Sequence, residues 1–273
     1  MQADLRNKTA LITGASSGIG EAVARELALR GCNLVLLARR RDRLDALANE
    51  LAVPRDGRRQ AIVAVEADVS RDGDCERAVA EAHDRVGRID IVVANAGISV
   101  IGPLMKLSLE DHRRQLETNV FGVLRTFIAT RDDLQAQRGC IAVVGSVNGY
   151  LTVPSTGSYA MSKYAVRAFC DCLRMEVHPL GIAVTHIIPG FINTEIRHLD
   201  SQGVYRSERK DPIPTWLQMP AREAAEEIAD AIALREPERV LTRHGKLAVF
   251  LQHALPGVLE GIMRRAKISG SQR

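Results

Sequence analysis

Short apolar, β-branched runs alternate with longer helical patterns along the first two-thirds of the chain. The runs lie at residues 9–13, 33–38, 61–69, 89–97, 139–146 and 181–190. Most are apolar throughout rather than alternating apolar with polar, which is typical of strands covered on both faces. Helical patterns separate them at 18–30, 41–52, 72–86, 108–130 and 156–178. These repeats predict an α/β fold with a doubly wound parallel sheet in three α/β/α layers.

The length and composition of the chain suit one globular domain. Its 273 residues are 46% apolar and 26% charged, which is ample for a substantial core. No internal repeat or low-complexity linker is present, so we expect a single domain over 1–273 with a helical C-terminal extension at 244–273. Residues 191–219 show no period, and an irregular segment of that length is typically functional. A helix at 220–235 and a short strand at 239–242 follow it.

Charge, hydropathy and cysteine usage exclude several classes of protein. The net charge of +4 is scattered, so we expect no nucleic-acid partner. The sequence shows no secretory signal and no run of about 18 apolar residues, which favours a cytoplasmic protein without a transmembrane segment. Its five cysteines include no CxxC pair and are expected to be reduced thiols. His178, His186 and His198 lack ligand spacing, so no metal site is expected.

A glycine-rich turn follows the first predicted strand. In TGASSGIG (13–20), glycines stand at the junction of the strand and the next helix. Glycine allows a tight turn and close approach of a ligand, and the N-terminus of the helix favours a phosphate. The alternative is a plain tight turn, since the spacing is GxxxGxG rather than GxGxxG. The cofactor-binding residues expected here are Gly14, Ser16, Ser17, Gly18, Ile19 and Gly20.

Arginines follow the second predicted strand, in LLARRR. Enzymes that use NAD often carry an acidic residue about 20 positions after the glycines, whereas Arg39 stands here. A guanidinium can bind a 2′-phosphate through about 1.5–3 kcal/mol of charged hydrogen bonding, which predicts roughly 10- to 100-fold preference for NADP(H). The alternative for Arg39 is a solvated surface charge, and Arg40 and Arg43 are expected to be solvated.

Tyr159 and Lys163 form a YxxxK pair within a predicted helix, so both lie on one face. Hydride transfer to a ketone leaves an oxygen that needs a proton, and a nearby ammonium lowers the pKa of a phenol toward the range useful for that transfer. Tyr159 is therefore the candidate general acid/base. The alternative is an exposed pair without a role. Tyr150 and Tyr205 have no lysine one turn later, and Tyr164 directly follows Lys163.

Seven motifs in order make residues 5–195 resemble the short-chain dehydrogenase/reductase family. They are TGASSGIG (13–20), Asp68–Val69, NAG (95–97), Asn119, Ser146, YxxxK (159–163) and PGFINT (189–194). The resemblance implies a Rossmann-like fold, with Ser146 donating to the substrate oxygen, Lys163 holding the nicotinamide ribose and Asn119 holding a proton-conducting water. It also implies cofactor contacts at Asp68, Val69, Asn95, Ala96, Gly97, Tyr159, Lys163, Pro189, Gly190, Ile192 and Thr194. Ala94 departs from the family's frequent NNAG.

We therefore expect an NADP(H)-dependent oxidoreductase acting on a carbonyl compound or secondary alcohol. The apolar stretches 98–104 and 147–151 favour a lipophilic substrate, either steroid-like or a medium-chain carbonyl compound, although Arg206, Arg209 and Lys210 could attract an acidic one. The family's habit of pairing through 108–130 and 156–178 implies a homodimer or homotetramer. The extension at 244–273 is expected to pack over the pocket or a second subunit; the alternative is a membrane-surface contact. The main alternative function is a regulator that binds NADP(H) without turnover. A lyase or epimerase on the same scaffold is a further alternative.

Overall fold

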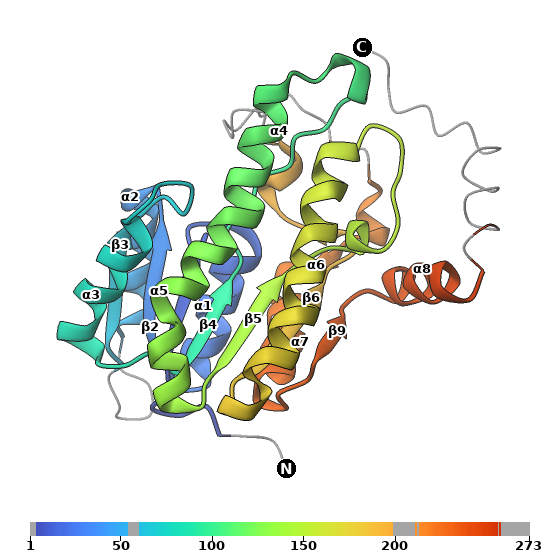
Figure 1. Ribbon diagram of the computed structural model, residues 1–273. Coiled ribbons are helices and arrows are strands. Elements are labelled where there is room, and N and C mark those ends of the chain that lie inside the picture. The colour runs from blue at the N-terminus through green and yellow to red at the C-terminus, as the bar shows by residue number, and fades with distance from the viewer. Residues whose placement is uncertain (1–3, 54–59, 199–210, 212, 256, 258–273) are drawn as a thin grey trace.

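Seven parallel strands form one central sheet in the computed structural model, which describes residues 4–53, 60–198, 211, 213–255 and 257 (Figure 1). The strand order is β3-β2-β1-β4-β5-β6-β9, and every neighbouring pair is parallel. The predicted doubly wound sheet is confirmed. The strands are β1 (Thr9–Thr13), β2 (Asn33–Ala38), β3 (Ile62–Glu66), β4 (Ile91–Ala94), β5 (Cys140–Val144), β6 (Ala183–Ile188) and β9 (Glu238–Val240).

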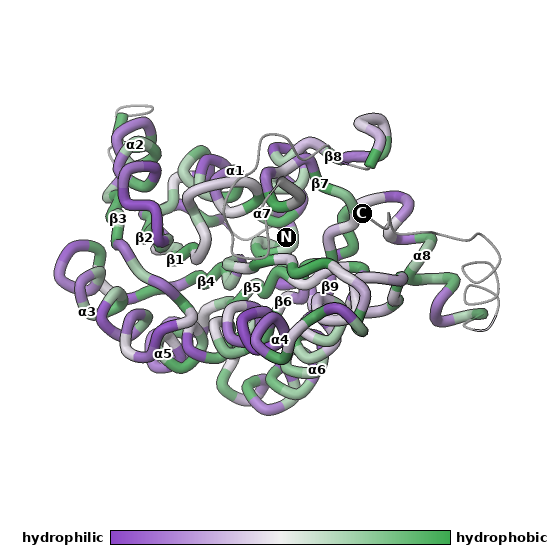
Figure 2. The backbone as a smooth tube through the Cα atoms, turned by 90° about the horizontal axis from the view of Figure 1, so that it is seen from above, coloured by the Kyte–Doolittle hydropathy of each residue, from purple (hydrophilic) through white to green (hydrophobic). Residues whose placement is uncertain are grey.

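Helices cover both faces of the sheet (Figure 2). One core cluster joins the sheet to α1 (Gly18–Leu29), α2 (Arg41–Leu51) and α7 (Ala221–Ala233), and a second joins it to α3 (Asp74–Val86), α5 (Gly122–Gln137) and α6 (Gly157–Val177). Within β1, Ala10 and Ile12 belong to the first cluster, and Leu11 belongs to the second. Since both faces are buried, successive residues are all apolar, which explains the unbroken runs in the sequence.

The helix predicted over 108–130 is three consecutive helical segments. These are α4 (Leu109–Leu116), a π-helical turn η2 (Glu117–Phe121) and α5, which continues to Gln137. Ser108 begins α4 with a capping box, because it exchanges hydrogen bonds with Asp111. The predicted helical stretch is therefore helical, but it extends to Gln137 and contains a π-turn that the pattern did not indicate. A π-turn inserts an extra residue into a helix and is frequent at functional sites, and this one contains the buried Asn119.

The segment predicted to be irregular, 191–219, carries short elements at both ends. β7 (Ile192–Asn193) pairs in parallel with β8 (Met219–Pro220), and two 3₁₀ turns lie between them, η5 (Glu195–His198) and η6 (Thr215–Leu217). Tyr205, Arg206, Arg209 and Lys210 lie outside the described residues. The other 3₁₀ turns are η1 (Leu104–Lys106), η3 (Val147–Gly149) and η4 (His178–Leu180).

A further helix, α8 (Arg243–Ala254), follows β9. The side chain of Thr242 caps it by accepting the N–H of Gly245 at 3.2 Å. Val249 packs with Tyr150 and Ile188, so this part of the extension lies against the chain that follows β5. No helix among the described residues has the length and apolarity that crossing a membrane requires. The rest of the extension, from 258 onward, is outside the described residues.

The direction in which strands are added reverses between β1 and β4. From β1 the chain adds β2 and then β3 on one side, and it crosses through α3 to place β4 on the other. Loops therefore leave the carboxyl ends of β1 and β4 in opposite directions and open a crevice there. In sheets of this kind, ligands bind in that crevice.

Candidate active site

Thr13, Gly14 and Asn95 form the floor of the crevice at the carboxyl ends of β1 and β4. The amide of Asn95 donates to the carbonyls of Thr13 and Gly14 at 2.9 and 3.3 Å. The buried hydroxyl of Thr13 accepts the N–H groups of Asn95 and Ala96, both at 3.0 Å. These bonds fix the glycine turn against the end of β4. Sequence reasoning missed Thr13, although its polar side chain ends an otherwise apolar strand.

The glycines of the turn sit where side chains would collide. Gly14 has φ +67°, and a Cβ there would lie 2.9 Å from the Cα of Ala96. At Gly20 a Cβ would lie 2.4 Å from the carbonyl oxygen of Gly14. Gly18, with φ +62°, begins α1 and faces Thr194. The turn thus brings bare backbone to the N-terminus of a helix, and this arrangement fits the phosphates of a dinucleotide.

A second part of the crevice lies beyond β2 and β3. Arg39 and Asp68 line a cavity of about 410 Å³ there, together with Arg71 and Arg77. Arg39 is exposed, whereas the carboxylate of Asp68 accepts the N–H and the hydroxyl of Ser70 at 3.0 and 2.7 Å. The structure thus brings Arg39 and Asp68 to the same cavity.

Arg40 differs from its sequence-based prediction. Its Nε and Nη2 donate to the hydroxyl of Ser16 at 3.2 and 3.0 Å, and Nη2 donates to that of Ser17 at 2.7 Å. Its Nη1 lies 3.6 Å from Glu195, which also pairs with Arg43 at 2.9 Å. Arg40 is therefore half-buried rather than solvated as predicted, whereas Arg43 remains exposed. Only the tertiary structure brings Glu195, which follows PGFINT, beside them.

Lys163 is buried beside Tyr159 on α6. Its Nζ donates to the carbonyl of Val144, at the end of β5, at 2.8 Å, and lies 5.7 Å from the centroid of the Tyr159 ring. Desolvation by burial lowers the pKa of Lys163 to about 8. The structure therefore brings the YxxxK pair to the carboxyl end of the sheet, with the ammonium held inside and Tyr159 partly exposed.

Ser146 lies between the carbonyl that binds Lys163 and the turn η3. Its hydroxyl accepts the N–H of Asn148 at 3.1 Å. Gly149, at the end of η3, lies so close to α6 that a Cβ would sit 2.8 Å from the carbonyl oxygen of Lys163. The turn and α6 are thus packed together, and Ser146 is held on the same side of the sheet as Lys163.

The buried amide of Asn119 connects the NAG segment to α6. Its Oδ1 accepts the N–H of Ile98 at 2.9 Å, and its Nδ2 donates to the carbonyl of Ile98 and the hydroxyl of Ser162, both at 3.1 Å. The hydroxyl of Ser162 in turn donates to the carbonyl of Tyr159 at 2.7 Å. Asn119 therefore braces the backbone at Tyr159. Sequence reasoning missed Ser162, a polar residue inside the YxxxK pair.

The PGFINT segment lies next to the start of α8. The carbonyl of Pro189 accepts the N–H of Val147, at 3.0 Å, which links the segment to η3. The N–H of Phe191 donates to Nε2 of His244 at 3.2 Å, and the two rings are stacked at 5.2 Å. A Cβ on Gly190 would lie 2.6 Å from that Nε2. His244, in the extension, is a neighbour that sequence reasoning missed.

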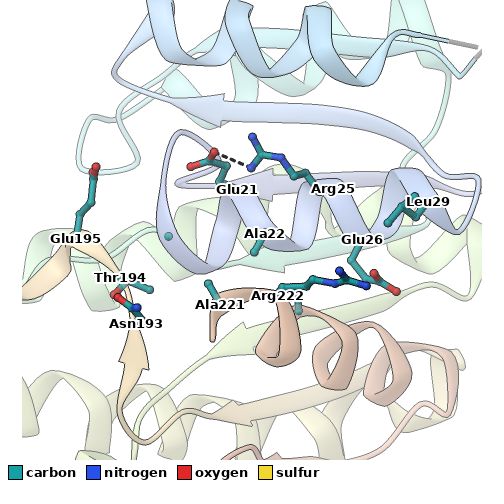
Figure 3. A pocket seen from close by; sticks show the side chains of 12 residues that line it. Glu21, Ala22, Arg25, Glu26, Leu29, Asn193, Thr194, Glu195, Ala221 and Arg222 are labelled. Carbon is teal, nitrogen blue, oxygen red and sulfur yellow. Dashed lines mark hydrogen bonds and ion pairs between the residues drawn. The ribbon is translucent and has the colours of Figure 1, made fainter. Parts of the chain in front are cut away.

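The remaining predicted residues lie at the start of α1 and in the segments that follow β3, β4 and β6. Val69 is buried against Gly122 of α5, and Ile19 packs on the core beside the turn. Gly97 faces Asn119, because a Cβ there would lie 3.3 Å from its Oδ1. Ile192 is buried in β7, and Thr194 borders a groove of about 740 Å³ between α1 and α7 (Figure 3).

That groove is separate from the catalytic candidates. Its walls include Glu21, Arg25 and Glu26, and Glu21 and Arg25 pair with each other at 2.6 Å. Tyr159 and Lys163 are not among the described residues that line this groove. Within the described parts of the chain, no group of three His, Cys, Asp or Glu side chains is arranged to hold a metal ion.

The doubly wound sheet, the glycine turn at its switch point and the buried lysine beside a tyrosine define a Rossmann-like nucleotide-binding oxidoreductase. The family model described as short chain dehydrogenase matches residues 8–204. The chain belongs to the short-chain dehydrogenase/reductase family.

Individual proteins resemble the chain over most of its length. A dehydrogenase/reductase SDR family protein 7-like of Anopheles gambiae is 35% identical over 269 residues, which cover 96% of this chain and 83% of that protein. An alcohol dehydrogenase of Thermococcus sibiricus, solved with 5-hydroxy-NADP, is 32% identical with a TM-score of 0.75, and the match covers 86% of this chain and 96% of that protein. A family member from Burkholderia phymatum, solved with NAD, is 25% identical with a TM-score of 0.81, and the match covers 94% of this chain and 96% of that protein. Together these similarities support a nicotinamide cofactor.

Proposed function

We propose that the protein is an NADP(H)-dependent oxidoreductase that interconverts a lipophilic ketone and its secondary alcohol. The observation that carries the proposal is the buried Nζ of Lys163, 5.7 Å from the Tyr159 ring at the carboxyl end of β5. When bound, the nicotinamide supplies or accepts the hydride. The protein then has to move one proton and to hold the reacting oxygen in place.

Tyr159 is the group that we assign to proton transfer. The positive charge on Lys163 favours the phenolate and so lowers the pKa of the phenol. Since burial lowers the pKa of Lys163 to about 8, this assistance is present below that pH and declines as the pH rises through it. Ser146 holds the substrate oxygen by donating its hydroxyl proton, which its bond to the N–H of Asn148 leaves available. Asn119 holds the backbone at Tyr159 in place through Ile98 and Ser162. We also assign to Asn119 the binding of the water that conducts protons.

Arg39 and Arg40 support the choice of NADP(H) over NAD(H). Arg39 is exposed beside Asp68, and Arg40 is fixed to the hydroxyls of the glycine turn. A 2′-phosphate carries nearly two negative charges and is well matched to such guanidinium groups. We expect NADPH to bind roughly 10- to 100-fold more tightly than NADH.

Exposed apolar side chains in the segment that follows NAG support a lipophilic substrate. Ile101 and Leu104 are 55% and 58% exposed, and Met105 is fully exposed. Competition between apolar and carboxylated ketones tests this point, and a strict requirement for a carboxylate would refute it. The cytoplasmic location, the homo-oligomer and the single domain remain predictions.

The test of the reaction is a screen of carbonyl compounds that follows NADPH absorbance with matched tyrosine variants. Tyr159→Phe should lower kcat at least about 100-fold, since positioned acid/base groups contribute about 10²–10⁴. Tyr164→Phe is the control, because Tyr164 lies on the same helix and donates instead to the carbonyl of Tyr150 at 2.5 Å. Unchanged turnover in Tyr159→Phe would refute the acid/base assignment. Cofactor binding without turnover of any compound would favour the regulator.

A further inference from the structure

An ionic contact joins the phosphate side of the crevice to the segment after β7. Glu195 directly follows Thr194 and begins η5. Its Oε2 lies 2.9 Å from Nη1 of Arg43 and 3.6 Å from Nη1 of Arg40. Figure 3 shows the side chain of Glu195 extending away from Ala221 and Arg222. Two regions about 150 residues apart in sequence therefore share one carboxylate.

Of the two arginines at this contact, Arg40 is oriented toward the glycine turn. Arg40 makes three hydrogen bonds to the hydroxyls of Ser16 and Ser17, which fixes its guanidinium beside the turn. Arg43 lies one helical turn further along α2. The glycine turn therefore fixes the position of Arg40, while the guanidinium of Arg40 also lies near the carboxylate of Glu195.

Glu195 relieves repulsion in a cluster of three arginines at the start of α2. Burial and the charge of Arg43 lower the pKa of Arg40, Arg39 adds to this, and Glu195 acts against it. The side chains of Arg40 and Glu195 are each 37% exposed, so a ligand from solvent can reach the contact. An anion that enters the cluster meets a site that already contains one negative charge.

We propose that Glu195 limits the preference for NADP(H) by competing with its 2′-phosphate for Arg40 and Arg43. The inference rests on the proposed use of NADP(H). A phosphate monoester carries about −1.5 to −2 charges at pH 7, and it repels the carboxylate from guanidinium donors that both require. NAD(H) lacks this group and leaves the Glu195 contact intact. Glu195 therefore weakens the binding of NADP(H) without weakening that of NAD(H).

The experiment measures dissociation constants of NADPH and NADH by fluorescence titration of the full chain. Glu195→Gln keeps the shape of the side chain and removes its charge. We expect the Kd for NADPH to fall about fivefold, equivalent to about 1 kcal/mol, and the Kd for NADH to change less than twofold. The gain should shrink at high salt, because exposed charges are screened. In an Arg40→Gln background, the gain should also diminish, since one of the contested donors is then absent.

Asp45→Asn is the matched control, because Asp45 lies on the same helix and pairs with Arg41 at 2.9 Å. It should leave both dissociation constants unchanged. An unchanged or higher Kd for NADPH in Glu195→Gln, or an equal gain for both cofactors, would overturn the inference. If the wild-type protein prefers NADH while Glu195→Gln still tightens NADPH alone, the competition stands and the proposed NADP(H) preference is refuted.

Discussion

Replacing Lys163 with methionine separates the catalytic contribution of the buried ammonium from its effect on stability. Burial lowers the pKa of Lys163 from 10.5 to about 8. At 1.36 kcal/mol per pKa unit, the charged form destabilises the folded state by about 3 kcal/mol at pH 7. In the variant the buried carbonyl of Val144 loses its donor, which costs about 1–3 kcal/mol. Lys163→Met should therefore unfold with a free energy equal to that of the wild type or up to about 2 kcal/mol higher.

The dependence on pH gives the sharper test. Between about pH 8 and pH 10.5, the unfolded chain keeps the lysine proton that the folded chain has lost, so the stability of the wild type rises with pH relative to the variant. Below pH 8 the penalty of the buried charge is fully present. Subtracting the variant from the wild type removes the contribution of the titrating groups that do not interact with Lys163. The difference should thus shift by about 3 kcal/mol in favour of the wild type across this range.

Urea unfolding of both proteins at a series of pH values measures this difference, and NADPH oxidation measures activity. Lys163→Met should lose at least about 100-fold in kcat while it remains folded, because Tyr159 then lacks the neighbouring charge. A variant more than about 2 kcal/mol less stable than the wild type at pH 7, or a difference that does not depend on pH, would refute the electrostatic reasoning.

Three further predictions concern other buried groups. Gly20→Ala should lose about 1–3 kcal/mol and weaken cofactor binding, because its Cβ would meet the carbonyl of Gly14. Gly73→Ala should also lose stability, because Gly73 has φ +82°, but its Cβ would meet nothing within 4 Å and cofactor binding should remain intact in the same titration. Thr13→Val leaves two N–H groups without their hydroxyl acceptor and should lose about 2 kcal/mol in urea unfolding, whereas Thr13→Ser should retain most of the stability. Desolvation and then Lys163 lower the pKa of His186 to about 4, so the folded chain resists a proton that the unfolded chain accepts, and stability should fall by about 3 kcal/mol as pH drops from 6.5 to 4. His186→Leu should abolish that fall, and an identical acid profile would contradict the assignment.

Much of the crevice was predictable because the pattern locates the ends of the strands, which the glycines, Asp68 and Ser146 follow. The YxxxK pair lies in the first two turns of α6, which the pattern also locates. Parallel strands bring their carboxyl ends to one edge, so residues after β1, β3, β4 and β5 must converge there. The structure places them so. Their assigned roles with substrate and cofactor remain proposals.

The π-turn at Asn119 could not be predicted in the same way. A periodic pattern shows that residues 108–130 are helical, but one inserted residue scarcely changes it. The turn is coupled to long-range bonds from Asn119 to Ile98 and Ser162, which no local spacing reveals.

By itself, the sequence predicted the sheet, the edge of the sheet that carries the glycine turn and the YxxxK pair, because burial on both faces, glycine geometry and helical spacing leave local signatures. The tertiary structure alone decided that Arg40 binds the turn, that Glu195 shares its charge and that His244 supports Phe191. Such contacts join segments far apart in the chain, and their energies depend on distances that exist only after folding.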